Sequence, residues 1–333
     1  MKIYRQLADI PPDFGPSVAT IGNFDGVHRG HGSIIAEVVR RARALGIHSV
    51  AITFDPHPAR ILRPQVHQPL IAPLSRKIEL LAATGLDALL VLPFTGDFAR
   101  MTAREFSSEV LQRTLHVTEL HEGENFRLGY QAEADIEALK QLGEQFGFKL
   151  CTHGSQIVRH QAVSSSRIRQ LIAQGDVSHA RALLGRPFSV VSTPASGRGY
   201  GTRYTVPTIN LAPYTELLPA NGVYVTTLTV GSGPSQETFE AVTNVGNRPT
   251  FGADSFAVES HLLNFHPIEL SEETSLVLTF LLRLRAERRF PTPEALREQI
   301  GRDVLRAKRY FTLCAAVASK PRNSAAQQTS QVL

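Results

Sequence analysis

The chain has 333 residues, of which 42% are hydrophobic and 20% are charged, as in a globular protein rather than a disordered one. This length predicts two domains, each large enough to bury its own core. No apolar run approaches the roughly 20 residues of a membrane span, and the N-terminus lacks the apolar stretch of a secretory signal. Only two cysteines occur, Cys151 and Cys314, far apart in sequence. We therefore expect no disulfide framework, no membrane contact and a cytoplasmic location.

The formal net charge is +5 and the sequence pI is near 9.4. A basic protein can bind nucleic acid, but here lysine and arginine are spread along the chain. They form no block of like charge, and no basic segment alternates with aromatic residues. Anionic small substrates such as ATP explain the charge equally well, so we expect no nucleic-acid partner.

The first half of the chain alternates short apolar runs with amphipathic segments. Strands are predicted at residues 17–21, 50–54, 88–92, 117–121 and 150–152, and helices at 33–45, 76–84, 103–111 and 136–146. Alternation of this kind implies right-handed crossovers. It predicts a Rossmann-like α/β domain, with a mostly parallel sheet covered by helices on both faces.

The pattern changes after Gly185-Arg186-Pro187, where helical periods give way to two-residue alternation. Strands are predicted at residues 223–230, 239–245, 256–263 and 275–285, with turn formers between them. This favours a small antiparallel β-barrel, followed by one helix that Thr292 caps. The predicted domains are therefore 1–185 and 186–312. Residues 313–333 are predicted to be a disordered tail, because the sequence from 319 onward is polar and aperiodic.

A glycine-rich turn with two histidines follows the first predicted strand. Residues 22–26 read Gly-Asn-Phe-Asp-Gly, and His28 and His31 come next at the start of a helix. Ligands of parallel sheets bind beyond the carboxyl ends of strands, where helix N-termini attract phosphate. Imidazole N–H groups in this position can stabilise charge that develops on a phosphate. Two other interpretations stay open at this point: an exposed turn, and a metal site formed by His28, His31 and Asp25. A zinc site would usually have further Cys or His partners at suitable spacing, and none stand out nearby.

A second phosphate-type element lies near the end of the first domain. Residues 163–169 read Val-Ser-Ser-Ser-Arg-Ile-Arg and open another helix. Hydroxyls and unpaired N–H groups at a helix start, together with Arg167, suit a polyphosphate. The alternative is a serine cap followed by surface arginines. The two elements in this order predict a nucleotide site more specifically than either does alone.

Four segments resemble the bacterial bifunctional riboflavin kinase/FMN adenylyltransferase (FAD synthetase) family: residues 22–31, 53–58, 123–129 and 163–169. The resemblance implies that His28 and His31, in the His-x-Gly-His signature, stabilise the α-phosphoryl transition state. It places these residues at the ATP phosphates: Gly22, Asn23, Phe24, Asp25, Ser164, Ser165 and Arg167. It places these near FMN or adenine: Thr53, His57, Asn125 and Arg127. Two positions depart from the family pattern, because Asn125 replaces an Asp and Gly32 replaces a Gln.

The second half carries neutral oxygen ligands and a carboxylate. Thr208 and Asn210 are two residues apart, so in an extended segment both side chains point the same way. With ATP phosphates, such oxygens can hold Mg²⁺. Glu259, in a predicted strand, can accept the proton of an attacking hydroxyl. From the residues alone, a Pro-Thr-x-Asn turn and a solvated strand glutamate explain the same pattern.

The same resemblance extends over the second half and implies a riboflavin kinase domain. It implies that Thr208 and Asn210 bind the Mg²⁺–ATP complex and that Glu259 is the general base for the riboflavin 5′-hydroxyl. Gly201 and Arg285 are implied at the ATP or flavin site. The segment Gly201–Val206 departs from the family's glycine loop, because its β-branched residues narrow the backbone freedom.

The expected chemistry is therefore riboflavin plus ATP to FMN and ADP, then FMN plus ATP to FAD and pyrophosphate, with Mg²⁺ as cofactor. The expected ligands are riboflavin, FMN, ATP and FAD. Three alternatives stay open. The chain could be a single-activity descendant without kinase function, a nucleotidyltransferase with another acceptor, or a flavin- or RNA-binding regulatory protein.

Overall fold

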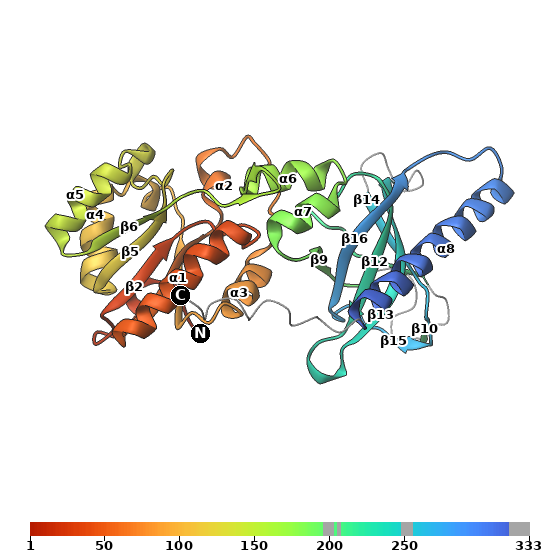
Figure 1. Cartoon of the computed structure of the whole chain (residues 1–333), viewed down its shortest axis with the longest axis horizontal. Coiled ribbons are helices and arrows are strands. Elements are labelled where there is room, and N and C mark those ends of the chain that lie inside the picture. The colour runs from red at the N-terminus through yellow and green to blue at the C-terminus, as the bar shows by residue number, and fades with distance from the viewer. Residues whose placement is uncertain (196–202, 205–207, 248–255, 320–333) are drawn as a thin grey trace, which may run out of the picture. The chain divides into compact units, whose positions relative to one another are not determined.

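The computed structural model describes residues 1–195, 203–204, 208–247 and 256–319, which form two compact units (Figure 1). The first unit comprises residues 1–173, 179–186 and 215–218, and the second comprises 174–178, 187–214 and 219 onward. The main division thus falls between Arg186 and Pro187, with two short exchanges of chain. No helix in the described part of the chain is long and apolar enough to cross a bilayer.

The first unit is built on a six-stranded sheet whose neighbouring strands are all parallel, in the order β1-β4-β3-β2-β5-β6. Its strands are β1 (Lys2–Tyr4), β2 (Ser17–Ile21), β3 (His48–Asp55), β4 (Ala88–Pro93), β5 (Val117–Gly123) and β6 (Lys149–His153). All five residues of β2 are buried, as expected of a central strand that is covered on both faces. The predicted parallel α/β fold is confirmed.

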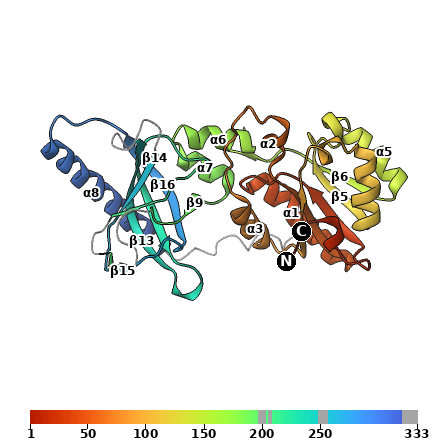
Figure 2. The same ribbon diagram turned by 180° about the vertical axis from the view of Figure 1, so that it is seen from behind.

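Helices cover both faces of this sheet. The helices of this part of the chain are α1 (Arg29–Leu45), α2 (Pro58–Leu62), α3 (Leu74–Ala82), α4 (Ala103–Phe106), α5 (Ile136–Phe146), α6 (Ser165–Ala173) and α7 (Val177–Leu184). One core cluster joins α1 and α3 to the sheet through residues such as Val38, Leu81 and Leu89. A second cluster packs α4, the π-helix at Ser107–Thr114 and α5 against the opposite face. Figure 2 shows the same layers from behind.

The chain reverses its direction of travel across the sheet at β2. It runs from β2 to β3 and β4 on one side, then returns to β5 and β6 on the other. Crevices at such a switch point, beyond the carboxyl ends of the strands, are where open α/β sheets bind ligands. The turn at residues 22–28 leaves β2 at this point and leads into α1.

The second unit is an antiparallel sheet in the order β11-β14-β13-β12-β16-β9. Its strands are β9 (Phe188–Ser192), β11 (Thr208–Asn210), β12 (Gly222–Val230), β13 (Glu237–Asn247), β14 (Phe256–Leu262) and β16 (Leu276–Ala286). The edge strands are joined by a bridge between Pro194 and Leu211, and Ala195 N–H donates to Asn210 O at 2.8 Å. The sheet therefore curls into the predicted small barrel. Two short strands, β10 (Arg203–Tyr204) and β15 (Ile268–Glu269), pair antiparallel in a separate two-stranded sheet.

A long helix, α8 (Pro293–Ala318), follows the barrel and packs on β12 and β13. Thr292 caps it, as predicted, by accepting the N–H of Ala295 at 3.2 Å. The helix continues six residues beyond 312, so the prediction that disorder begins at 313 is wrong for residues 313–318. Leu313, Ala315 and Ala316 favour a helix, and no glycine or proline interrupts the segment. Residues 320–333 lie outside the described part of the chain.

Candidate functional site

His28 and His31 form one stacked pair at the start of α1. Helix α1 begins at Arg29, four residues earlier than the predicted 33, and His28 is its N-cap. The His31 N–H donates to His28 Nδ1 at 3.3 Å, and the two ring centroids lie 3.6 Å apart at an interplanar angle of 14°. The imidazole itself is the capping group, so the signature histidines help to form the helix N-terminus that a phosphate would meet.

Both histidines are neutral at pH 7. Burial, opposed in part by Asp25, lowers the pKa of His28 to about 4. Burial, with further contributions from His28 and Lys77, lowers the pKa of His31 well below its usual value. Because His28 Nδ1 accepts a hydrogen bond, its proton resides on Nε2, which leaves an N–H donor. His31 Nδ1 is buried and has no hydrogen-bond partner among the described residues, as expected of a group that binds a ligand.

These pKa values predict a pH-dependent stability. The unfolded chain takes up a proton on His28 near pH 6.5, whereas the folded chain does so only near pH 4. The stability contributed by neutral His28 is thus fully present above pH 6.5 and is lost as the pH falls through about 4, a change of about 3 kcal/mol. His28→Asn keeps a good cap, so denaturant unfolding of the variant should show a flatter dependence between pH 7.5 and 4.5. Equal slopes for the two proteins would contradict this assignment.

The turn before α1 is strained and closely packed. Phe24 and Val27 have positive φ values of 45° and 37°, which are rare for side chains of this kind. Gly26 has a φ of 77°, and a Cβ there would lie 2.7 Å from Ile71 Cγ2. A Cβ on Gly30 would lie 3.3 Å from the His28 ring, so the glycine of the signature leaves room for the imidazole. The strain is consistent with a backbone shaped for binding rather than for stability alone.

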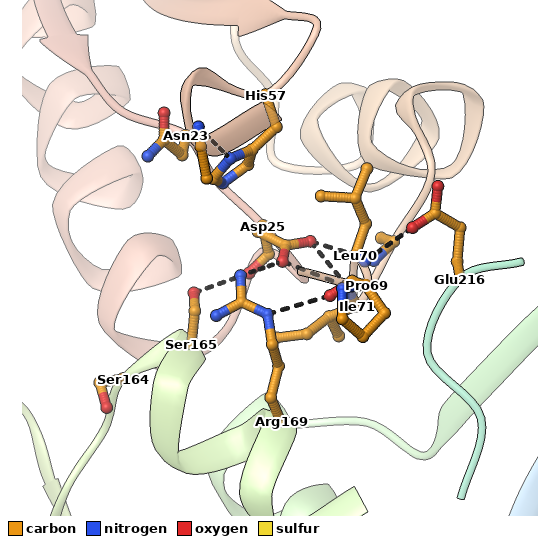
Figure 3. A network of polar contacts seen from close by, with 12 residues as sticks. Asn23, Asp25, His57, Pro69, Leu70, Ile71, Ser164, Ser165, Arg169 and Glu216 are labelled. Carbon is orange, nitrogen blue, oxygen red and sulfur yellow. Dashed lines mark hydrogen bonds and ion pairs between the residues drawn. The ribbon is translucent and has the colours of Figure 1, made fainter. Parts of the chain in front are cut away.

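Asp25 is the centre of a buried polar network (Figure 3). Its carboxylate accepts the N–H groups of Ile71 and Ala72 at 3.0 and 3.1 Å, and it pairs with Arg169 at 2.6 Å. Arg169 also donates to Pro69 O at 3.2 Å, and Ser165 Oγ donates to Asp25 O at 3.0 Å. Asp25 thus joins the turn after β2 to the 69–72 segment and to α6, and its charge is neutralised within the protein.

Asp25→Ala is therefore expected to destabilise the first unit. The substitution leaves Arg169, whose side chain is only 15% exposed, without its carboxylate. Removal of one partner of a buried ion pair costs about 3–5 kcal/mol. Asp97→Ala is the matched control, because its ion pair with Arg100 is exposed and should contribute about 0–1 kcal/mol. Equal unfolding midpoints for the two variants would show that the Asp25 network does not stabilise the fold.

The predicted phosphate residues of the 163–169 segment lie at the start of α6. Ser164 Oγ accepts the N–H of Arg167 at 3.3 Å and so acts as a cap, while Ser165 donates to the Asp25 carbonyl. Arg167 is half-buried and donates to Gln161 at 3.2 Å. The structure brings Ser165 beside the Asp25 turn, joining residues about 140 positions apart in sequence. Among the described residues, no hydrogen bond joins Ser164 or Arg167 to the His28–His31 pair.

The residues predicted near FMN or adenine lie in different surroundings. Thr53 is fully buried at the end of β3, and its hydroxyl lies 3.4 Å from Asn23 O. His57 caps α2, and burial lowers its pKa to about 4. Asn125 is exposed, and Arg127 is exposed and paired with Asp135 at 3.4 Å. Thr53 and His57 thus belong to the buried site region, whereas Asn125 and Arg127 lie on the loop after β5.

Sequence reasoning missed several charged groups at this site. Lys77 is buried on α3 and donates to Asn23 O at 3.0 Å and to Thr53 Oγ1 at 3.3 Å. Arg186 donates to Val27 O at 3.0 Å, and buried Glu122 accepts the N–H of Ile21 at 2.6 Å. Lys77 shares a helix face with Leu81, four residues later. A lysine on an otherwise apolar helix face indicates a buried cation, and this pattern was available in the sequence. No local pattern marks Arg186 or Glu122.

The barrel carries the second cluster of predicted residues in one row across its strands. Asn210 on β11 pairs with Glu259 on β14, and Glu259 pairs with Asn244 on β13. Two positions along, on the same face, Thr208 pairs with His261, and their Oγ1 and Nδ1 atoms lie 3.4 Å apart. The structure therefore brings the predicted oxygen ligands next to the predicted base and adds Asn244, which sequence reasoning did not select.

Arg285 lies farther along the same row. It pairs with Val223, which pairs with Asn244, so three strand spacings, about 14 Å, separate it from Glu259. Its guanidinium binds buried Asp303 of α8 at 2.9 Å. Arg285 is thus not in contact with Glu259. Gly201, together with residues 202 and 205–207, lies outside the described residues.

A phosphate-type turn at the switch point of a parallel sheet, followed by a barrel with a carboxylate among neutral oxygens, defines an enzyme of the transferase class with two domains. A family model for FAD synthetase matches residues 10–167, and one for riboflavin kinase matches residues 184–311. The bifunctional riboflavin kinase/FMN adenylyltransferase of Pseudomonas fluorescens is 33% identical over 309 residues, covering 92% of this chain and 97% of the relative. The enzyme of that name from Escherichia coli K12 is 32% identical over 316 residues, covering 94% and 99%. The chain belongs to the bifunctional riboflavin kinase/FMN adenylyltransferase family.

A solved structure supports the fold over nearly the whole length. The crystal structure of a protein named macrolide-efflux protein, from Streptococcus pneumoniae, matches with a TM-score of 0.76 at 26% identity. The match covers 91% of this chain and 96% of that one. Both units of the present chain therefore have the folds found in that structure.

Proposed function

We propose that this chain makes FAD from riboflavin in two ATP-dependent steps, one in each domain. The barrel phosphorylates riboflavin to FMN, and the α/β domain adenylylates FMN with release of pyrophosphate. The observation that carries the proposal is the His28–His31 stack at the N-terminus of α1, beyond the carboxyl end of β2. Membership of the family is the reason for proposing a flavin as the substrate.

In the proposed adenylyl transfer, the protein provides fixed donors rather than a covalent intermediate. FMN phosphate attacks the α-phosphorus of ATP, and negative charge builds up on the oxygens in flight. His28 Nε2–H and His31, both neutral, donate hydrogen bonds to these oxygens, and the amides at the start of α1 add their dipole. Ser164, Ser165 and Arg167 hold the triphosphate from the start of α6. Asn23 and Phe24 line the turn, while Asp25 holds the turn and α6 in place.

In the proposed phosphorylation, Glu259 accepts the proton of the riboflavin 5′-hydroxyl as that oxygen attacks the γ-phosphorus of ATP and ADP leaves. The hydroxyl oxygen of Thr208 and the amide oxygen of Asn210 are hard donors on the same face as Glu259, so they fit Mg²⁺. When bound, Mg²⁺ would offset the charge of the ATP phosphates. Arg285 and Gly201 are proposed contacts of ATP or flavin. We place the reaction in the cytoplasm, where Cys151 and Cys314 would stay reduced.

A flavin separation tests the proposal directly. The purified chain is incubated with riboflavin, ATP and Mg²⁺, and the flavins are resolved by chromatography. Appearance of both FMN and FAD is the expected result. FMN without FAD would refute the adenylyltransferase assignment. FAD made only from supplied FMN would refute the kinase assignment and favour a single-activity enzyme.

A further inference from the structure

A cluster of metal-binding side chain types lies on the sheet of the first unit, apart from the nucleotide turn. Glu119 and His121 are on β5, and Cys151 and His153 are on the neighbouring strand β6. One ligand atom from each of Glu119, His121 and Cys151 lies within 4.8 Å of the others. Glu119 and His121 are buried, and Cys151 is half-buried. In the family assignment above, none of these residues has a role.

Strand register explains why the four side chains meet. Positions 119 and 121 point to one face of β5, and His121 pairs with Cys151 while Gly123 pairs with His153. Leu120 and Leu150 point to the opposite face, into the core cluster beneath α5. The shared face lies under α1, because Arg41 of that helix binds Glu119. Strand β6 is the sheet edge, so solvent can reach Cys151 there.

The outer partners of a metal site are already present. His121 Nε2 lies 3.3 Å from Glu119 Oε2, and His121 Nδ1 lies 2.9 Å from His153 Nε2. A metal-binding histidine usually hydrogen-bonds through its second ring nitrogen, which orients the ring, and His153 fills this role. Tetrahedral Zn²⁺ needs ligand atoms separated by about 3.5 Å, so small rotations of the side chains suffice. Sulfur and nitrogen ligands favour Zn²⁺ over Mg²⁺ or Ca²⁺.

We propose that Glu119, His121 and Cys151 bind a divalent transition metal ion such as Zn²⁺, which fastens β6 and β5 beneath α1. Glu119 Oε2, His121 Nε2 and Cys151 Sγ are the ligands, and the remaining position takes water. His121 moves its proton from Nε2 to Nδ1, and His153 moves its own from Nε2 to Nδ1, so the pair stays neutral. The Cys151 thiol loses its proton to solvent, and one proton is released per metal ion bound.

Arg41 is the natural competitor of this metal. Its Nε donates to Glu119 Oε2 at 2.8 Å, and a second guanidinium nitrogen binds Oε1. The arginine side chain is 32% exposed and can keep Oε1 while Oε2 turns to the metal. Removal of this cation should therefore strengthen metal binding, whereas loss of a merely structural residue would not.

Cobalt substitution provides the test, because a Co²⁺–thiolate bond absorbs in the near ultraviolet and a Co²⁺ bound only by N and O does not. The full chain is stripped with a chelator, kept reduced with a phosphine and titrated with Co²⁺, then with Zn²⁺ as competitor. The expected result is one thiolate band that Zn²⁺ removes and about one proton released per ion. The apparent Zn²⁺ affinity should fall at least about ten-fold in Cys151→Ser and rise in Arg41→Gln.

The second cysteine supplies the control. Cys314 is exposed on α8, so Cys314→Ser should keep the band, the affinity and the Zn²⁺-induced rise in unfolding temperature. Cys151→Ser should lose all three while its metal-free unfolding temperature shows that it is folded. Absence of the band in the folded wild type would overturn the proposal. Survival of the band in Cys151→Ser, or its loss in Cys314→Ser, would do the same.

Discussion

His31→Ala is expected to lower the rate of FAD formation from FMN and ATP by about 10²–10³-fold, the usual cost of one lost transition-state donor. Formation of FMN from riboflavin should be unchanged, because His31 belongs to the α/β domain. The ring is neutral and stacked on His28, and its buried Nδ1 has no hydrogen-bond partner among the described residues. Each flavin is quantified by chromatography at saturating ATP.

The measurement separates transition-state binding from simple affinity. A donor that acts only in the transition state lowers kcat and kcat/KM together, whereas a ground-state contact raises KM. His48→Ala is a control for loss of a histidine in the same domain, because His48 is exposed at the start of β3. Wild-type FAD formation in folded His31→Ala would contradict the assignment. Loss of FMN formation together with loss of folded protein would indicate that the substitution had damaged the whole chain.

Much of the fold could be predicted from the sequence because the strongest signals are periodic. The strand at 17–21 and the helix at 136–146 have the predicted bounds. Helix α1 starts earlier than predicted because His28 caps it, a role that serine, threonine, aspartate or asparagine usually takes. The end of α8 was missed because the prediction extended the polar tail back to residue 313, although residues 313–318 are apolar and alanine-rich and favour a helix.

The site could be predicted only in part, because motifs show which residues are near in sequence and not which are near in space. The register that places Glu259 between Asn210 and Asn244 depends on strand pairing over long separations. The pairing of Asp25 with Arg169 likewise joins residues 144 positions apart. The sequence suggested Asp25 as a phosphate neighbour, and only the structure shows that an internal cation neutralises it.

Glu259→Gln is expected to lower FMN formation from riboflavin by about 10²–10⁴-fold, as for loss of a general base, while FAD formation from supplied FMN continues. The amide keeps the shape of the side chain between Asn210 and Asn244, so the barrel should stay folded. The effect should appear mainly in kcat, because the amide can still hydrogen-bond the hydroxyl but cannot take its proton. Glu269→Gln is the control, since Glu269 is exposed on β15.

Glu259→Asp distinguishes a base from a residue that only positions riboflavin. Aspartate keeps the carboxylate but is shorter, so it should restore part of the activity that glutamine loses, whereas a positioning role predicts that glutamine is the better replacement.

The two domains then give opposite patterns: His31→Ala makes FMN but little FAD, and Glu259→Gln makes FAD only when FMN is supplied. A mixture of the two folded variants should convert riboflavin to FAD, because FMN released by one can be used by the other. If the mixture makes no FAD although each variant keeps its own activity, FMN does not pass between molecules under these conditions. Loss of both activities in either folded variant would contradict two separate sites.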